Sequence, residues 1–520
     1  MPERIADDGC ATGADAQPAR RHAGLSKSSI AAFEQCPKRL WLAFNRPDAA
    51  ERVDDDSRIV AGHMVGAVAR SLLPAGKLVD EPDLGRALEA TDRLLGDPAT
   101  EAIFEATFAV EGVLVRVDIL EADGSGGWRI AEVKSTTAVK AEHIGDLATQ
   151  VWAVRHAGCR LTGAAVRHID NTFVLTRDGD YHGAFVDEDV LADVQDLANG
   201  RPALIAAARA TLAGDLPVHG VGKHCSDPHP CPFSDHCHSA LPPGPDWPVT
   251  ILPHGGGKRW VAVGVNDLLE IDEAQLANAT HLKVHRATVT GETFHDHAGA
   301  RAAIDAWPFP RTWLDFETIA FPLPRWVGTK PYEQVAFQFS AHVEHEDGRL
   351  DHHEFLSLDG EDPRRSCAEA LARLPATGAV VAYNAPFERG CIERLAAAFP
   401  DLAAPLLLLS SRLVDLLPVT KANWYHRDQR GSWSIKAVLP TMTDLSYGAL
   451  EVKDGMQAQA AYLEAIEGTS PERLATLDAG LRAYCGQDTL AMIAVARRLT
   501  ASAAPSGPPS GLPPGKAPAS

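Results

Sequence analysis

Three separated segments in the second half of the chain carry acidic residues at spacings suited to metal chemistry. In TWLDFETI, Asp315 and Glu317 stand two residues apart in an apolar run of strand length, so both carboxylates leave the same face of a strand. Burying two like charges is costly unless a cation neutralises them. This pair therefore predicts a metal site.

The other two segments supply further ligands. VVAYNAPFERGCIERL is typical of a buried strand leading into a helix that carries Glu388, and LRAYCGQDTLAMIAV of an amphipathic helix with Tyr484 and Asp488 four residues apart, on one face. Four carboxylates can hold two Mg²⁺ or Mn²⁺ ions about 4 Å apart, one activating water and the other stabilising the leaving oxygen. We expect Tyr484 to orient that water, and the reaction to be phosphodiester hydrolysis.

A second cluster is expected in the first half of the chain. Asp118 ends one predicted strand and Glu132-Val133-Lys134 ends the next, so a hairpin brings two carboxylates and an ammonium together, with Glu132 and Lys134 on one face. Two carboxylates can hold Mg²⁺, and a lysine beside them can orient the attacking water and stabilise charge on a phosphate. The alternative is a solvated strand face with an ordinary Glu–Lys pair.

Four of the nine cysteines have the spacing of metal ligands. Cys36 follows the first predicted helix, and Cys225, Cys231 and Cys237 lie together in HCSDPHPCPFSDHC. Nine is a small, odd number for a disulfide framework, whereas four thiolates can hold a 4Fe-4S cluster or tetrahedral Zn²⁺. The spare ligands for zinc are His224, His236 and His238.

The segment KANWYHRDQRGSWSIK combines four Lys or Arg residues with a single carboxylate and three interleaved aromatic residues. Such a mixture suits a surface that follows a nucleic-acid backbone and stacks on its bases. The alternative is that the aromatic residues are core. The candidate nucleic-acid-binding residues are Lys421, Arg427, Arg430, Lys436 and Trp433.

The elements that must position these residues alternate between helix and strand. In the first half, helical periodicity covers residues 25–70, 141–154 and 187–212, and a strand hairpin is expected over 104–120 and 128–133. In the second half, strands are expected at 311–316, 335–343 and 379–382, and helices near 367–374, 387–398 and 470–499. Both halves therefore predict an α/β fold.

Length and composition predict two modules. A chain of 520 residues exceeds the size of one hydrophobic core, and 45% hydrophobic with 23% charged residues is typical of a globular protein. The Pro/Gly-rich stretch 242–260 marks a boundary near residue 245. Residues 246–304 are expected to be a linker or a small inserted region, and the ends, 1–24 and 501–520, to be disordered.

Charge and missing motifs limit the partners. The net charge of −20 disfavours a general affinity for nucleic acid, although a metal-dependent nuclease needs carboxylates at its site. No apolar stretch reaches about 18 residues and the first 24 lack a signal-peptide core, so we expect a cytoplasmic protein without a membrane partner. Any helicase would be a separate partner, since no G-x4-G-K-S/T loop occurs.

Residues 25–245 resemble the RecB-type PD-(D/E)XK nucleases, including the CRISPR-associated RecB-like exonucleases. The resemblance rests on LSKSSIAAFEQCPKRLWL, a histidine on a helix, the Asp and Glu-x-Lys pattern above, and a glutamine on the following helix. It implies a restriction-endonuclease-like fold in which Lys134 is catalytic and Gln150 supports the site. The implied metal ligands are His63, Asp118, Glu132 and the backbone carbonyl of Val133. A tyrosine frequent in the family is replaced by Val154.

The cysteines add to this resemblance. One cysteine before the nuclease core and three after it is similar to the iron-sulfur members of the same group, in which the cluster joins the ends of the domain. The resemblance implies a 4Fe-4S cluster on Cys36, Cys225, Cys231 and Cys237. Both spacings are C-x5-C, whereas a shorter first gap is usual, and zinc remains the alternative.

Residues 305–500 resemble the DnaQ-like DEDD exonucleases, which have the ribonuclease H fold, on D-x-E, N-x-x-F-(D/E) and Y-x3-D. The resemblance implies that Tyr484 positions water. The implied metal ligands are Asp315, Glu317, Glu388 and Asp488. Glu388 stands where aspartate is usual, so it either reaches the metal with a longer arm or weakens the activity.

The order of the two modules resembles a family of bacterial fusion proteins of unassigned function in which FP-x-x-WLDFET recurs. We therefore expect Mg²⁺- or Mn²⁺-dependent phosphodiester hydrolysis, exonucleolytic on single-stranded or end-opened DNA, with two active sites on one chain, in repair or in defence. Three alternatives stay open: one catalytic module with the other as a clamp, an RNA exonuclease, and a non-catalytic scaffold or redox sensor built on the cysteines.

Overall fold

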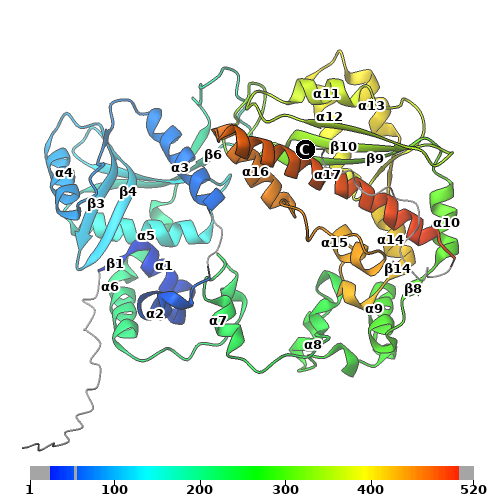
Figure 1. The fold of residues 1–520 in the computed structure, drawn as a ribbon. Helices are drawn as coiled ribbons and strands as arrows, with labels where there is room; N and C mark the ends of the chain where they lie inside the picture. The colour runs from blue at the N-terminus through cyan, green and yellow to red at the C-terminus, as the bar shows by residue number, and fades with distance from the viewer. Residues whose placement is uncertain (1–23, 52–55, 503–520) are drawn as a thin grey trace, which may run out of the picture. The chain divides into compact units, whose positions relative to one another are not determined.

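A computed structural model describes residues 24–51 and 56–502, and within these ranges the chain forms two compact units. The first unit contains residues up to 55, 62–169 and 185–240; the second contains 56–61, 170–184 and 241 onward. Both combine helices with a mixed sheet (Figure 1), which confirms the expected α/β class. The tails expected to be disordered lie almost entirely outside the described residues.

The first unit is built on one mixed sheet of order β2-β3-β4-β5-β6-β7, with β1 beside β4. Strands β3, β4 and β5 are antiparallel, and β6 is parallel to β5. The bounds are β1 Leu25–Ser26, β2 Lys77–Leu78, β3 Ala102–Val110, β4 Val113–Ala122, β5 Trp128–Lys134, β6 Leu161–Ile169 and β7 Phe185–Asp189. The hairpin formed by β4 and β5 therefore lies in the interior of the sheet.

Two elements of this unit differ from the expectation. The run 104–120 is two strands, because Glu111 and Gly112 have positive φ values of 46° and 69° and turn the chain. The stretch expected to be helical from residue 187 begins instead with β7, where Asp187 pairs with Arg167 on the adjacent β6 and with Arg129 on β5, the next strand along. Cross-strand ion pairs thus outweigh a short helical pattern.

The helices of the first unit cover the sheet. Ser26 caps the first of them by accepting a hydrogen bond from Ser29 N–H. Cys36 separates the first two helices because the residue before Pro37 disfavours helix, while Pro37 suits the first turn of the next. The bounds are α1 Lys27–Gln35, α2 Pro37–Asn45, α3 Asp56–Ser71, α4 Leu84–Gly96, α5 Ala141–His156, α6 Leu191–Ala213 and α7 Ser234–Ser239.

The second unit has a five-stranded sheet of order β11-β10-β9-β12-β13. Strand β9 is antiparallel to β10 and parallel to β12. The strands are β9 Arg311–Ile319, β10 Val335–Glu344, β11 Leu350–Leu356, β12 Val380–Ala382 and β13 Leu413–Asp415. The helices around it are α11 Arg364–Leu371, α12 Pro386–Ala398, α13 Ala403–Ser411, α16 Gly455–Glu467 and α17 Pro471–Thr500.

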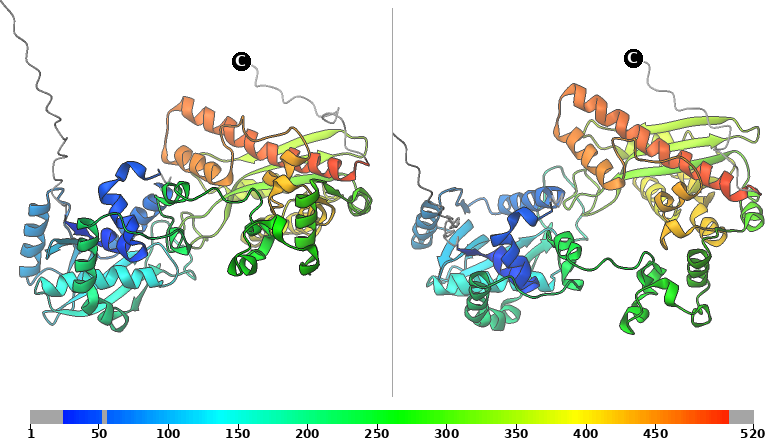
Figure 2. Two further views of the ribbon diagram at one scale, coloured as in Figure 1. Left: turned by 90° about the horizontal axis from the view of Figure 1, so that it is seen from below. Right: turned by 60° about the horizontal axis from the view of Figure 1, so that its bottom comes forward.

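Alternation along β9 assigns its side chains to the two faces of this sheet. Leu314 and Phe316 pack with α11, α12 and α13. Trp313 and Ile319 pack on the opposite face, where α16 and α17 lie along the sheet in both views of Figure 2. Asp315 and Glu317, between Trp313 and Ile319 in the alternation, therefore face α17.

Residues 246–304 pack within the second unit. They are therefore a folded region rather than a linker. Their helices are α8 Lys258–Ala262, α9 Ala279–Thr290 and α10 His297–Asp305. Val284 and Ile304 share a hydrophobic core with Trp313 and Trp424. Strand β8 (Phe294–His295) pairs with β14 (Trp424–Tyr425), so the region is fixed to the fold by both core packing and backbone hydrogen bonds.

A short piece of the expected first module also belongs to the second unit. The backbone of Leu175 donates to Thr329 O at 3.1 Å and accepts from Gly328 N–H at 2.7 Å. The Tyr181 hydroxyl donates to Pro324 O at 3.0 Å.

No described helix is both long and apolar enough to cross a membrane.

Candidate metal sites

The second unit brings the expected carboxylates together. Asp315 and Glu317 on β9 face Tyr484 and Asp488, which lie one turn apart on α17. One oxygen each from Asp315, Glu317 and Asp488 lies within 4.8 Å of the others. Glu317 and Asp488 are each only 8% exposed. We call Asp315, Glu317, Asp488 and Glu388 the four-carboxylate site.

Glu388 lies close enough for its charge to act on Asp315, but among the described residues it is not part of the group within 4.8 Å. It lies in the first turn of α12, and Asp415 holds the turn by accepting from the Asn384 and Ala385 N–H groups at 3.0 and 3.2 Å. Asn384 has a φ of 81°, which asparagine tolerates better than most residues. Glu388 is 3% exposed, and its Oε2 has no hydrogen-bond partner among the described residues.

The electrostatics of the four-carboxylate site call for a cation. Burial, followed by the charges of Asp488, Glu317 and Glu388, raises the pKa of Asp315 well above its usual range. Burial and Asp488 raise the pKa of Glu317 to about 8, and burial raises that of Glu388 to about 8. Acidic groups that resist ionising without a counter-charge, one with an unpartnered oxygen, fit divalent metal ions.

Two hydroxyls and an ammonium border these carboxylates. Tyr447 donates to Asp488 Oδ1 at 2.6 Å, and Lys436 Nζ donates to the Tyr484 hydroxyl at 3.1 Å. Lys436, expected on a nucleic-acid surface, therefore lies at the carboxylates themselves. Tyr447 was not expected, since nothing in its sequence surroundings marks a loop residue as a neighbour of Asp488.

In the first unit, Asp118 and Glu132 lie where the backbone pairing between β4 and β5 ends. Strands β4 and β5 pair as far as Ile119 and Ala131. At the next step Asp118 Oδ2 accepts from the Val133 N–H at 2.8 Å, so a side chain replaces the backbone partner. Glu132 is 1% exposed. We call Asp118 and Glu132 the two-carboxylate site.

Lysines and an amide surround Glu132. Lys134 Nζ lies 3.0 Å from Glu132 Oε1 and 2.8 Å from Asp146 Oδ2, Lys27 Nζ lies 2.6 Å from the same Glu132 oxygen, and Gln150 Nε2 donates to Glu132 Oε2. Lys134 and Gln150 thus take the expected places. Lys27 and Asp146 were missed, because nothing local in the sequence ties residue 27 to residue 132.

The pKa values of the two carboxyl groups of this site are shifted in opposite directions. Burial, reinforced by the charge of Glu132, raises the pKa of Asp118 to about 7. For Glu132, burial is outweighed by Lys27 and Lys134, and its pKa falls to about 2. The Gln150 Oε1 is buried without a hydrogen-bond partner among the described residues. Among the described residues, neither Asp118 nor Glu132 belongs to a group of three candidate metal ligands, so a divalent ion at this site stays a prediction.

His63 does not join this site in the structure. It lies exposed on α3. Among the described residues, no group of candidate metal ligands within 4.8 Å of one another includes His63. The ligand role implied for this histidine therefore has no geometric support here.

The four expected cysteines line one cavity of the first unit, with His219 and His224. Burial raises the pKa of Cys231, and the neighbouring Cys36 and Cys225 add to the rise. His224 Nε2 lies 3.7 Å from Cys225 Sγ. The cavity therefore collects soft ligands from the start and the end of the unit. His236 and His238 are not among its lining residues.

Sulfur spacing bears on which metal group fits the cavity. Zn–S bonds of about 2.3 Å would place tetrahedral thiolates about 3.8 Å apart. Among the described residues, the ligand group within 4.8 Å that contains Cys36 is completed by His219 and His224, and no group combines three of the cysteines. Thiolate and imidazole are both ligands of zinc, so the choice between a 4Fe-4S cluster and zinc stays a prediction.

Replacing Cys231 by serine is expected to remove the bound metal and to lower the melting temperature of the first unit by roughly 5 °C. The metal would tie residue 36 to residues 225–237 and so close a long loop. Iron and zinc analysis with visible absorbance would measure the loss. Cys159→Ser, a half-buried thiol in the same unit outside the cavity, is the control, and equal metal content in both variants would contradict the assignment.

The basic and aromatic segment 421–436 lies partly on the surface and partly in the core of the second unit. Arg427 and Arg430 are exposed, with their guanidinium carbons 5.5 and 5.4 Å from the ring centroid of half-buried Trp247. Lys421 lies near His254, at 3.4 Å. Trp433 is only 6% exposed, and its indole N–H donates to Trp424 O. It is therefore a core residue, which was the alternative to a base-stacking role. Trp247, from the unassigned region, is the accessible aromatic at this surface.

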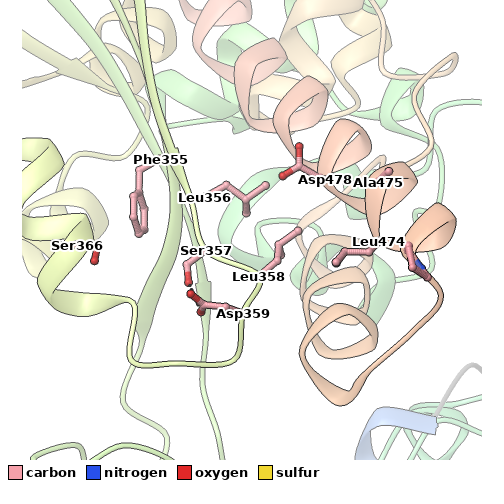
Figure 3. Close-up of a pocket in the computed structure, with 10 residues that line it drawn as sticks. Phe355, Leu356, Ser357, Leu358, Asp359, Ser366, Leu474, Ala475 and Asp478 are labelled. Atoms are coloured by element: carbon pink, nitrogen blue, oxygen red, sulfur yellow. Dashed lines mark hydrogen bonds between the residues drawn. The ribbon is translucent and has the colours of Figure 1, made fainter.

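A hollow beside the edge strand of the second unit has a different character. Figure 3 shows its lining, from the end of β11 and the following loop on one side to α17 on the other. Its acidic groups have local partners: Asp359 accepts from Ser357 at 3.0 Å and Asp478 pairs with Arg482 at 2.8 Å. It lacks the unpartnered carboxylates of the metal sites.

Comparison with known families covers part of the second unit. Residues 312–434 match the model of a domain of unknown function, DUF2779. The match contains Asp315, Glu317 and Glu388 and ends before Tyr484 and Asp488. No curated protein matches the chain.

Proposed function

We propose that this protein is a metal-dependent nuclease that hydrolyses phosphodiester bonds at the four-carboxylate site, with single-stranded or end-opened DNA as substrate. The observation that carries the proposal is the convergence of Asp315, Glu317 and Asp488 within 4.8 Å, with Glu317 and Asp488 buried. Such a cluster is costly to fold without a cation. Its residue types and order match the DnaQ-like resemblance.

The ligands would be the four carboxylates, and bound Mg²⁺ or Mn²⁺ would supply an activated water and charge stabilisation at the leaving oxygen. Tyr484, one helical turn from Asp488, holds its hydroxyl where it can orient the attacking water. Lys436 donates to that hydroxyl at 3.1 Å and so fixes its position beside the carboxylates. Tyr447 fixes the rotamer of Asp488 through its 2.6 Å hydrogen bond.

The two-carboxylate site supports a second nuclease centre of the RecB-like kind. Asp118 and Glu132 would hold one divalent ion, with Lys134 beside them to stabilise charge on the phosphate. Gln150 orients Glu132 through a hydrogen bond to Oε2. The cysteine cavity would hold a 4Fe-4S cluster with a structural role.

The proposal is tested with anaerobically purified protein on end-labelled single-stranded DNA and RNA in Mn²⁺. Wild type, Lys134→Ala and Asp315→Ala are compared. A fall in Mn²⁺-dependent release of label in Asp315→Ala supports the four-carboxylate site, and a fall in Lys134→Ala supports the two-carboxylate site. Release from RNA but not DNA would favour the RNA exonuclease, and no release from either polymer would favour the non-catalytic scaffold.

The exposed arginines beside Trp247 predict a salt-dependent contribution to binding. The double variant Arg427→Ala with Arg430→Ala is expected to weaken binding of single-stranded DNA and to reduce the slope of log affinity against log salt by about 2, because each lost phosphate contact removes about one unit. Fluorescence anisotropy over a KCl series measures this. Arg349→Ala, on an exposed arginine paired with Asp351, is the control, and an unchanged slope would exclude this surface.

A further inference from the structure

Lys27 has no role in the proposed metal sites, yet the fold holds its side chain beside Glu132. It is the first residue of α1, directly after the Ser26 cap. Residues Leu25 and Ser26 form β1, which pairs in parallel with Val113 and Leu114 of β4, the strand that carries Asp118. Strand pairing and the helix cap together direct residue 27 towards the two-carboxylate site.

Both oxygens of Glu132 already have partners. Lys27 Nζ lies 2.6 Å and Lys134 Nζ 3.0 Å from Oε1, and Gln150 donates to Oε2. A divalent ion on Glu132 must share or take over one of these positions. Two ammonium groups on a single oxygen also oppose a third cation by charge repulsion.

Lys27 is the more easily displaced of the two lysines. Lys134 has a second anchor in Asp146 at 2.8 Å, whereas among the described residues Lys27 Nζ hydrogen-bonds to Glu132 and has Asp118 and Asp146 only as nearby charges. Its side chain keeps 23% of its surface exposed, so it has a path towards solvent. A lysine at the start of a helix is also well placed for a phosphate, because helix N-terminal N–H groups favour anions.

We infer that Lys27 competes with the divalent ion for Glu132 and, once displaced, binds a phosphate of the nucleic acid beside the two-carboxylate site. The inference rests on the proposed metal role of that site. Metal binding and substrate binding then favour each other. A phosphate that draws Lys27 away from Glu132 makes the Oε1 atom of Glu132 more accessible to the metal ion. The ligand classes are thus a divalent cation and a nucleic-acid phosphate.

The test isolates the first site in full-length protein that carries Asp315→Asn and Asp488→Asn. In this background, Lys27→Met is expected to bind Mn²⁺ at least tenfold more tightly, measured from the free Mn²⁺ signal by electron paramagnetic resonance. The same variant is expected to raise the KM for single-stranded DNA about tenfold. Lys27→Arg, which keeps the charge, should keep the weaker Mn²⁺ binding, and Lys77→Met, an exposed lysine of β2, is the control for loss of charge.

The outcomes separate this inference from the proposed function. If Glu132→Gln abolishes Mn²⁺ binding but Lys27→Met leaves the affinity unchanged or weaker, the metal site stands and the competition is overturned. If no variant shows Mn²⁺ binding that depends on Glu132, the metal role of the site fails and the inference fails with it. Lys27→Gln replaces Lys27→Met if circular dichroism shows that the methionine variant does not fold.

Discussion

Replacing Asp315 by asparagine is expected to lower Mn²⁺-dependent DNA hydrolysis by the second unit at least about 1000-fold, as the loss of a ligand shared by two metal ions would. The assay is made in a Lys134→Ala background, so that any remaining cleavage comes from the four-carboxylate site. The physical reason is that Asp315 is the carboxylate whose pKa the other three raise, which places it at the centre of the cluster.

The same substitution is expected to stabilise the protein in chelator. Asparagine keeps the shape of Asp315 and removes one of the buried charges that repel one another. Lower activity with higher stability distinguishes a metal ligand from a residue needed for folding. Asp478→Asn, on α17 but paired with Arg482, is the control. Full activity in Asp315→Asn would contradict the assignment.

Stability of the second unit in chelator is expected to fall as pH rises from 5.5 to 8.5, by roughly 5 to 10 °C in melting temperature. The folded-state pKa values of Glu317 and Glu388 are raised to about 8, and that of Asp315 is raised well above its usual range. A carboxyl with a raised folded pKa stabilises the fold while protonated. This contribution is complete below the unfolded pKa and is lost as pH passes through the folded pKa.

Adding Mg²⁺ or Mn²⁺ at pH 8.5 is expected to restore the lost stability, since the ion binds the ionised carboxylates of the folded state. Tryptophan fluorescence follows this unit, because seven of the ten tryptophans lie after residue 240. The variant Asp315→Asn with Asp488→Asn should show a flatter pH profile. A wild-type stability that is constant or rises over this pH range would argue against a buried, uncompensated cluster.

The sequence predicted the four-carboxylate site because its geometry is local. A two-residue spacing on a strand fixes the shared face of Asp315 and Glu317, and a four-residue spacing on a helix fixes that of Tyr484 and Asp488. The approach of β9 to α17 then followed from packing of their apolar neighbours. Glu388 was predicted by its motif, and the Asp415 hydrogen bonds that hold its turn are a tertiary feature.

Long-range contacts account for what the sequence did not show. Lys27 meets Glu132 only because β1 joins the middle of the sheet, and Tyr447 reaches Asp488 from an irregular loop. The burial of Trp433 depends on residues 246–304, whose packing has no periodic signature over such short helices. The turn at Glu111–Gly112 interrupts an alternating pattern that continues on both sides of it.

Anomalous scattering from crystals grown with Mn²⁺ tests the central claim most directly. Two manganese peaks about 4 Å apart are expected in the second unit. Their ligands would be Asp315, Glu317, Glu388 and Asp488, and both peaks should vanish in the Asp315→Asn with Asp488→Asn variant. Well-ordered crystals with these four side chains resolved and no manganese between them would contradict the account.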